Sequence, residues 1–144
     1  MKKPAITLTP NELEIMELMW RENRPLSRTD IIELSPDRSW KASSIHILLN
    51  KMLDKDAIKV DGFVRTGKNY GRTYSPALSN VDYLLMTIKG SSLYQNSKKE
   101  ATIAVISSLI NDKDITAQDI REIEAVIEAK KSKLKETEIY ADKT

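Results

Sequence analysis

The sequence has no cysteine and only one histidine, His46. Without cysteine the chain can form no disulfide framework, no thiolate metal site and no cysteine nucleophile. A single histidine leaves no evident Ser-His-Asp set and no zinc site of the common kinds. A glycine-rich phosphate loop is missing as well. We therefore expect neither an enzyme nor a metal or cofactor site, and we interpret the chain as a binding protein.

Long apolar segments are also missing from the sequence. It has no run of about 18 apolar residues that could cross a membrane. Residues 1–4 lead into a helix-start signal instead of the apolar core of a signal peptide. These absences predict a cytoplasmic protein without membrane insertion.

A strong charge of either sign is absent too. The formal net charge is +2, which is too small to indicate a nucleic-acid partner by itself. Residues 1–78 carry 13 Lys and Arg against 10 Asp and Glu, whereas residues 79–144 carry 10 against 11. The positive excess belongs to the first part of the chain, so the local placement of the basic residues decides what it means.

The first part of the chain begins with two strong helix-start signals. Thr9 and Glu12 have the spacing of a capping box and predict a helix over residues 10–22. Ser27 and Asp30 repeat the pattern and predict a short second helix. With 144 residues, of which 40% are hydrophobic and 31% charged, the chain has room for one compact core and a smaller appendage.

A third helix follows, with one apolar face. Its apolar residues recur at i, i+3, i+4, i+7 and i+8: Ile45, Leu48, Leu49, Met52 and Leu53. If Lys41 is the N-cap, Trp40 and Ile45 have the spacing of a hydrophobic staple. The opposite face must then be exposed, and it is mainly polar.

A β-hairpin is predicted after the third helix. Residues 57–60 and 63–65 have the composition of one strand and residues 72–75 that of its return strand, with a loop at 66–71. The hairpin carries four basic residues against one acidic residue: Lys59, Arg65, Lys68 and Arg72 against Asp61. Three helices followed by a hairpin with a basic tip are typical of a winged helix-turn-helix.

The last part of the chain is predicted to be helical throughout, apart from a polar break near residues 90–97. Its three helices have about 65 residues and too little apolar surface for a stable fold of their own, so we expect pairing with a second copy. The expected dimer interface consists of Leu84, Ile88, Ile103, Ile106, Ile110, Ile120, Ile123 and Ile127. The predicted fold is mainly α with a small β-hairpin: a winged helix-turn-helix domain at 1–78 and a helical dimerisation region at 79–144.

The chain resembles the penicillinase-repressor family, which includes the β-lactamase and methicillin-resistance repressors and the copper-responsive repressors. The matching segments are residues 8–16 (LTPNELEIM) with Trp20, Trp40, residues 45–55 (IHILLNKMLDK) and residues 72–76 (RTYSP). The resemblance implies a homodimeric repressor that binds palindromic operator DNA, often with TACA/TGTA elements. It also implies that the last helices form the dimer interface.

The chain departs from this family in three places. Members usually have Ser-Pro after the tryptophan, where this chain has Lys41-Ala42. The β-lactam-controlled members are cut at an Asn-Phe bond, but the only phenylalanine here, Phe63, follows Gly62, and the comparable place falls near residues 107–109. The copper-responsive members carry paired cysteines, whereas this chain has no cysteine. Relief of repression is then left to cleavage at another bond, with a membrane sensor-protease as partner, or to an effector that shifts the dimer.

Given this resemblance, the exposed face of the third helix and the hairpin are the candidate DNA contacts. The candidates are Lys41, Ser43, Ser44, His46, Ile47, Asn50, Lys51, Arg65, Lys68 and Arg72. Serine and asparagine can bind base edges, and an isoleucine can touch a thymine methyl group. Lysines suit phosphates, and the hairpin suits phosphates or the minor groove.

Two other interpretations stay open at this point. The same residues could form a solvated polar face and a solubilising hairpin edge, with the histidine an ordinary surface or packed side chain. The chain could then be a winged-helix protein-interaction module, because the fold alone does not establish DNA binding. Sequence-dependent binding to operator-type DNA distinguishes the two functions.

Overall fold

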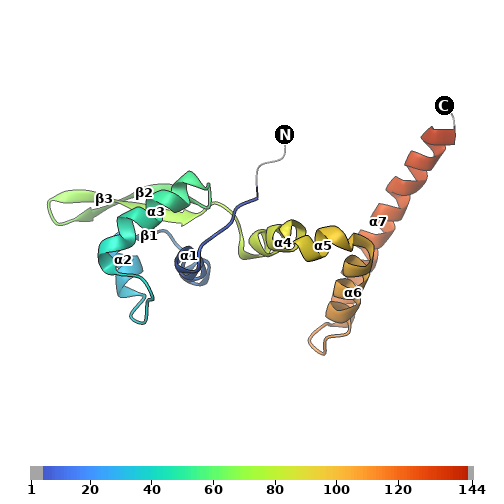
Figure 1. Ribbon diagram of the computed structural model, residues 1–144, viewed down its shortest axis with the longest axis horizontal. Helices are drawn as coiled ribbons and strands as arrows, with labels where there is room; N and C mark the ends of the chain where they lie inside the picture. Colours follow the sequence, from blue (N-terminus) through green and yellow to red (C-terminus); the bar gives the residue numbers. More distant parts are fainter. Residues whose placement is uncertain (1–4, 143–144) are drawn as a thin grey trace. The chain divides into compact units, whose positions relative to one another are not determined.

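The computed structural model describes residues 5–142, apart from the side chain of Thr66. The chain divides into two compact units, one ending at Gln95 and the other beginning at Asn96 (Figure 1). The elements in chain order are α1 (Pro10–Glu22), β1 (Leu26–Ser27), α2 (Arg28–Glu33), the 3₁₀ turn η1 (Ala42–Ser44), α3 (Ile45–Asp54), β2 (Ile58–Thr66), β3 (Asn69–Pro76), α4 (Asn80–Gly90), α5 (Ser92–Asn96), α6 (Lys98–Ile110) and α7 (Ala117–Asp142). The predicted class, a mainly helical winged helix-turn-helix followed by a helical segment, is confirmed.

Both predicted capping boxes are formed. The Thr9 hydroxyl accepts from the Glu12 backbone N–H at 3.3 Å, and the Glu12 carboxylate accepts from the Thr9 N–H at 2.8 Å. Ser27 and Asp30 make the same reciprocal pair at the start of α2. Asn23 caps the C-terminal end of helix α1, and its left-handed backbone (φ 53°) closes the last turn. Both helix starts are therefore encoded locally.

The start of the third helix differs from the prediction. Lys41 caps the 3₁₀ turn η1 without a side-chain hydrogen bond, and regular α-helix begins only at Ile45. The two residues of the predicted staple, Trp40 and Ile45, both lie in the hydrophobic core. The buried face contains Ile45, Leu49 and Met52.

The sheet has three antiparallel strands in the order β1-β3-β2. The short strand β1 pairs with β3 and was not predicted, because a strand of two residues shows no periodicity. The predicted loop at 66–71 is wrong in part: only Gly67 and Lys68 form the turn, since the two long strands stay paired as far as Thr66 and Asn69. The chain reverses at Gly67, whose φ of +65° suits glycine. A β-bulge lies between Val60 and Gly62.

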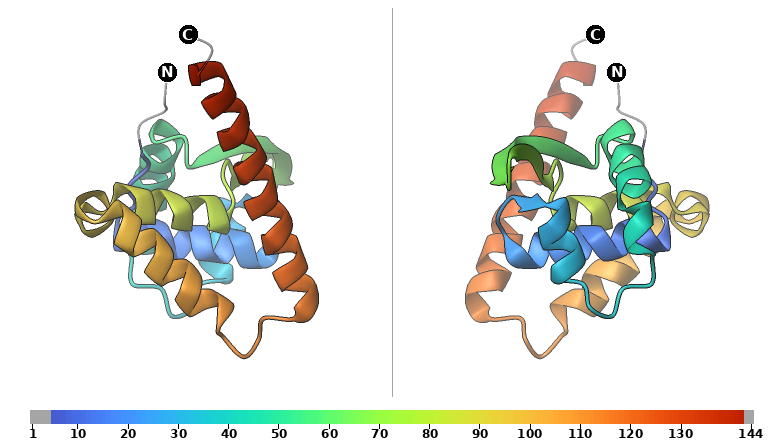
Figure 2. Two further views of the ribbon diagram at one scale, coloured as in Figure 1. Left: turned by 90° about the vertical axis from the view of Figure 1, so that its right-hand side faces the viewer. Right: turned by 90° about the vertical axis from the view of Figure 1, so that its left-hand side faces the viewer.

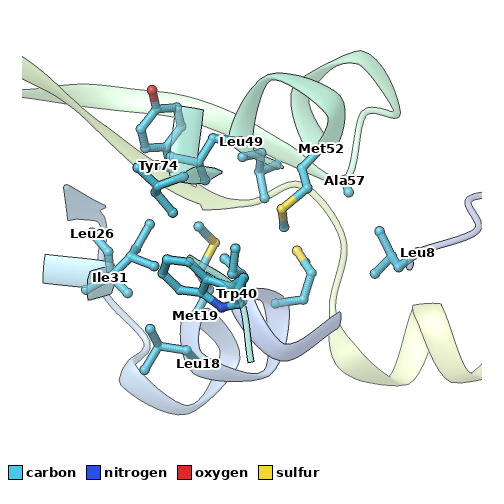
Figure 3. Packing of buried hydrophobic residues seen from close by; sticks show 14 residues of the cluster. Leu8, Leu18, Met19, Leu26, Ile31, Trp40, Leu49, Met52, Ala57 and Tyr74 are labelled. Atoms are coloured by element: carbon cyan, nitrogen blue, oxygen red, sulfur yellow. The ribbon is translucent and has the colours of Figure 1, made fainter. Parts of the chain in front are cut away.

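A single hydrophobic cluster holds the first unit together. Figure 3 shows side chains of α1, α2, α3 and the sheet converging on it, with Met19, Leu49 and Tyr74 among them. Helix α4 also attaches to this cluster. The Trp20 Nε1 donates to the Leu78 carbonyl at 3.0 Å, and the Trp20 ring lies 6.2 Å from that of Tyr83. The beginning of α4 therefore packs on the winged helix.

The second unit consists mainly of α6 and α7, which run in opposite directions from the turn that joins them (Figure 2). A third capping box, between Thr116 and Asp119, begins α7. Helix α5 occupies part of the predicted polar break at 90–97, which is therefore wrong in part. None of the residues of α4 to α7 is fully buried, so these helices leave most of their apolar surface uncovered. No helix within residues 5–142 has the length and apolarity needed to cross a membrane.

Candidate nucleic-acid interface

The exposed face of α3 carries four of the predicted DNA contacts. His46, Ile47, Asn50 and Lys51 are all exposed. Ile47 is the informative one, because 59% of this apolar residue is open to solvent on a helix that buries its other apolar face. These four residues therefore offer hydrogen-bonding groups, one positive charge and one apolar contact to a partner.

The 3₁₀ turn that precedes α3 carries the other predicted contacts on this side. Lys41 and Ser43 are exposed at its beginning, whereas Ser44 is half-buried. Ser44 is the least accessible of the three.

The wing, formed by β2 and β3, brings two of the basic residues of the hairpin, Arg65 and Arg72, to one side, whereas Lys59 pairs with Ser75 on the other face. Arg65 pairs with Tyr70 and Phe63 with Arg72 across the two strands. Side chains alternate along a strand, and cross-strand partners share a face. These four residues therefore share the face to which the buried Tyr74 also belongs. Lys68 lies in the turn at the tip.

Aromatic side chains on the wing were not predicted as contacts. Phe63 is 66% exposed and Tyr70 is 71% exposed, and each stands opposite an arginine. The sequence signal that could have identified them was an aromatic residue on each side of the hairpin turn, Phe63 before it and Tyr70 after it. The wing therefore presents a mixed aromatic and basic face.

Arg28 is a further residue that the sequence analysis missed. It is the first residue of α2, and its Nη1 contacts both ring nitrogens of His46 on α3. A hollow of about 300 Å³ lies beside this contact and extends to Arg72 on β3. The sequence signal for Arg28 was its position directly after the N-cap Ser27, at the beginning of the helix-turn-helix. The fold thus brings together three nitrogen-rich side chains from three elements.

The far end of α3 is fixed by a buried ion pair. The Lys55 Nζ lies 2.6 Å from the Glu12 Oε1 and 2.9 Å from the Thr7 carbonyl oxygen. Glu12 is fully buried. Burial raises the pKa of Glu12, but the hydrogen bonds from Lys55 and Thr9 outweigh it and hold that pKa below its ordinary value. This pair ties the end of α3 to the beginning of α1 and so orients the exposed face.

The predicted dimer residues are placed on uncovered surfaces. Leu84, Ile103, Ile106 and Ile127 are exposed, and the other four, Ile88, Ile110, Ile120 and Ile123, are half-buried. In the second unit α6 and α7 form an apolar groove of about 250 Å³ lined by Ile106, Leu109, Ile110, Ile115, Ile123, Val126 and Ile127. The groove brings together four of the predicted residues and adds Leu109, Ile115 and Val126, which were not predicted.

The described residues give no sign of a metal centre. Across residues 5–142, no three His, Cys, Asp or Glu side chains are grouped closely enough to hold an ion. The first unit presents a polar helix face with a basic wing, and the second unit presents an apolar groove.

The sequence model of the penicillinase repressor matches residues 8–129. The penicillinase repressor of Bacillus licheniformis is 22% identical over 125 residues, which cover 87% of this chain and 92% of that protein. An uncharacterized 16.5 kDa protein of Latilactobacillus sakei is 28% identical over 126 residues, which cover 85% of this chain and 80% of that protein.

Among solved structures, the adhesin competence repressor of Streptococcus pyogenes is similar over 90% of this chain and 82% of its own. The sequence identity is 11% and the TM-score is 0.38.

Proposed function

Since the chain belongs to the penicillinase repressor family, we propose that it represses transcription as a homodimer bound to a palindromic operator. Each copy places α3 in a major groove and its wing on the DNA backbone. Operators with TACA/TGTA dyads are the first candidates. The protein acts in the cytoplasm, and the region at 1–78 binds DNA while the region at 79–144 dimerises.

One observation carries this proposal: the exposed face of α3 and the basic wing belong to the same compact unit. An α-helix fits the major groove, where each base pair presents a distinct pattern of donors and acceptors. Asn50 and Ser43 can bind base edges there, and the exposed Ile47 can contact a thymine methyl group. Lys41 and Lys51 bind phosphates and set the register of the helix.

The wing has a different task from the helix. Arg65, Lys68 and Arg72 are exposed cations on it, and cations on an exposed hairpin suit the phosphate backbone or the minor groove. Contacts of this kind raise the affinity for any duplex. Specificity then comes from α3 and affinity mainly from the wing.

Dimerisation uses the apolar groove between α6 and α7 and the apolar residues of α4. Exposed apolar side chains line the groove without any polar contribution. Covering this surface with a second copy removes it from water. A two-fold dimer then presents two copies of α3 at a spacing that matches the two halves of a palindrome.

Relief of repression needs only a disturbance of this pairing. Cleavage in the second unit by a sensor-protease, or an effector that favours another dimer arrangement, would both remove the gain from binding two half-sites together. The region near residues 107–109 lies within α6, at the edge of the groove.

Fluorescence anisotropy with labelled duplexes tests the proposal. The full chain is titrated onto a TACA/TGTA dyad, onto the upstream DNA of its own gene and onto a shuffled duplex of the same composition. We expect binding to at least one of the first two to exceed binding to the shuffled duplex about 1,000-fold or more. Weak and equal affinity for all three would instead indicate a winged-helix protein-interaction module.

A further inference from the structure

The hollow between α2, α3 and the wing has a composition that suits an anion. It is lined by Ser27, Arg28, Thr29, Ile32, Ala42, Ser43, Ile45, His46, Gly71 and Arg72. Its lining includes two arginines and no acidic residue. The two hollows beside α1 differ, since Asp61 and Asp82 line one of them and Glu14, Glu17 and Asp37 the other.

The two arginines of the hollow lack the usual compensating partner. In the described part of the chain neither Arg28 nor Arg72 lies within ion-pair distance of a carboxylate, whereas Arg24 pairs with Glu22 and Asp30. A guanidinium has five N–H donors and accepts no hydrogen bond. The contact of Arg28 with His46 therefore leaves most of its donors unused.

This chemistry favours a phosphate oxygen. A guanidinium fork can hold two oxygens of one phosphate at once. The hydroxyls of Thr29 and Ser43 at the rim are exposed and can donate as well. Because α3 forms one wall, an anion seated here lies beside the proposed recognition surface.

We propose that Arg28 and Arg72 clamp one backbone phosphate of the operator, with His46 holding Arg28 in position. The inference rests on the proposed DNA binding and gives His46 a different task from reading a base. The clamp joins the wing to the helix-turn-helix through a single phosphate. It thereby fixes how far α3 lies along the major groove.

The first test measures affinity and salt dependence for three single variants and one double variant. Arg28→Ala and Arg72→Ala should each weaken binding about tenfold on operator and shuffled DNA alike, and lower the salt slope by about one. The fold loss in affinity of the double variant should be smaller than the product of the two single losses, because both residues hold the same phosphate. Arg21→Ala, an exposed arginine of α1, is the control for loss of one positive charge.

The second test identifies the phosphate and the task of His46. Methylphosphonate is introduced at one operator position at a time, and one position should weaken the natural protein but not Arg28→Ala or Arg72→Ala. His46→Ala should lower the salt slope and keep the base preference, with no further effect in the Arg28→Ala background. His46→Gln, which can still accept from Arg28, should restore most of the loss.

The outcomes separate the clamp from the proposed function. A natural protein without preference for any operator overturns the proposed function and the clamp with it. If the natural protein binds its operator, and Arg28→Ala behaves like Arg21→Ala, only the clamp is overturned. If His46→Ala changes the base preference, and does so in the Arg28→Ala background as well, His46 does not act by positioning Arg28.

Discussion

Glu12 and Lys55 form the charged contact on which the orientation of α3 depends. The carboxylate is fully buried and the ammonium is partly exposed, with 33% of its side chain open to solvent. Removing one partner of a buried pair leaves the other without compensation. The pair therefore matters more for the placement of the proposed recognition surface than the exposed pairs elsewhere in the described chain.

Glu12→Gln should lower the free energy of unfolding at neutral pH by about 1–3 kcal/mol, because the amide cannot form the ion pair with Lys55. The folded pKa of Glu12 lies below its unfolded value. Its stabilisation is therefore fully present above the unfolded pKa and is lost as the pH falls through the folded pKa. Urea unfolding at several pH values measures this, and the difference between the two proteins should shrink in acid. Glu17→Gln, exposed on the same helix, should show no such difference at any pH.

The two kinds of proposed DNA contact should respond differently to single substitutions. Asn50→Ala or Ser43→Ala should relax the base preference, at a cost of about 1–3 kcal/mol on the correct operator. Lys68→Ala, at the tip of the wing, should weaken all duplexes alike and lower the salt slope by about one. Anisotropy titrations on operator and shuffled DNA at several salt concentrations measure both effects. If Lys68→Ala changed only the base preference, the wing would not be a backbone contact.

Among the elements, the wing shows how a single backbone position controls a hairpin. Gly67 adopts a φ of +65° at the turn and a Cβ added there would meet no other atom within 4 Å. The cost of a side chain is therefore conformational and not steric crowding by neighbours. Gly90, in α4, has equal space but ordinary helical backbone.

Opposite effects are expected from the same substitution at these two glycines. Gly67→Ala should destabilise the protein by about 1 kcal/mol, since alanine resists the left-handed conformation. Gly90→Ala should stabilise it by about 0.4–1 kcal/mol, chiefly by restricting the unfolded chain. Thermal unfolding monitored by circular dichroism compares the two with the natural protein. Destabilisation of equal size at both sites would show that the conformation of Gly67 is not the cause.

For the whole molecule, the uneven distribution of buried residues is the main feature. The core cluster is drawn from residues 8–74, with partly buried neighbours as far as Tyr83, whereas α6 and α7 bury none of their residues fully. A helical unit without a buried residue is poorly stable alone. The second unit therefore needs a partner surface, which the proposed dimer supplies.

Charge in the groove should break the dimer. Ile123→Asp with Ile127→Asp places unpaired charges on an apolar surface and should shift the protein to monomers at micromolar concentration. Light scattering measures the mass, and Ser132→Asp, exposed on the same helix, is the matched control. A natural protein that is monomeric under these conditions would contradict the proposed assembly.

Loss of the second unit should leave a folded but weakly binding protein. A chain ending at Gln95 keeps the entire core cluster, so its melting should stay cooperative. It should bind one operator far more weakly than the full chain, because the gain from two linked half-sites is lost. Equal affinities in an anisotropy titration would mean that the second unit does not control DNA binding.

The sequence by itself determined the features that depend on neighbours a few residues away. The capping boxes at Thr9 and Ser27 use partners three residues on, so their spacing was sufficient to predict two helix starts. The apolar face of α3 could equally be predicted from the sequence, because helical periodicity is a local property. From these and the hairpin signal followed the winged-helix class and the candidate face on α3.

Only the tertiary structure decided the contacts between distant segments. Strand β1 exists because β3 offers it a partner, and the wing is long because cross-strand pairing continues beyond the residues with clear strand propensity. Lys55 meets Glu12 across 43 residues and Arg28 meets His46 across 18. Such pairs depend on how helices pack around the core, and packing is set by the whole set of buried side chains and not by any short pattern.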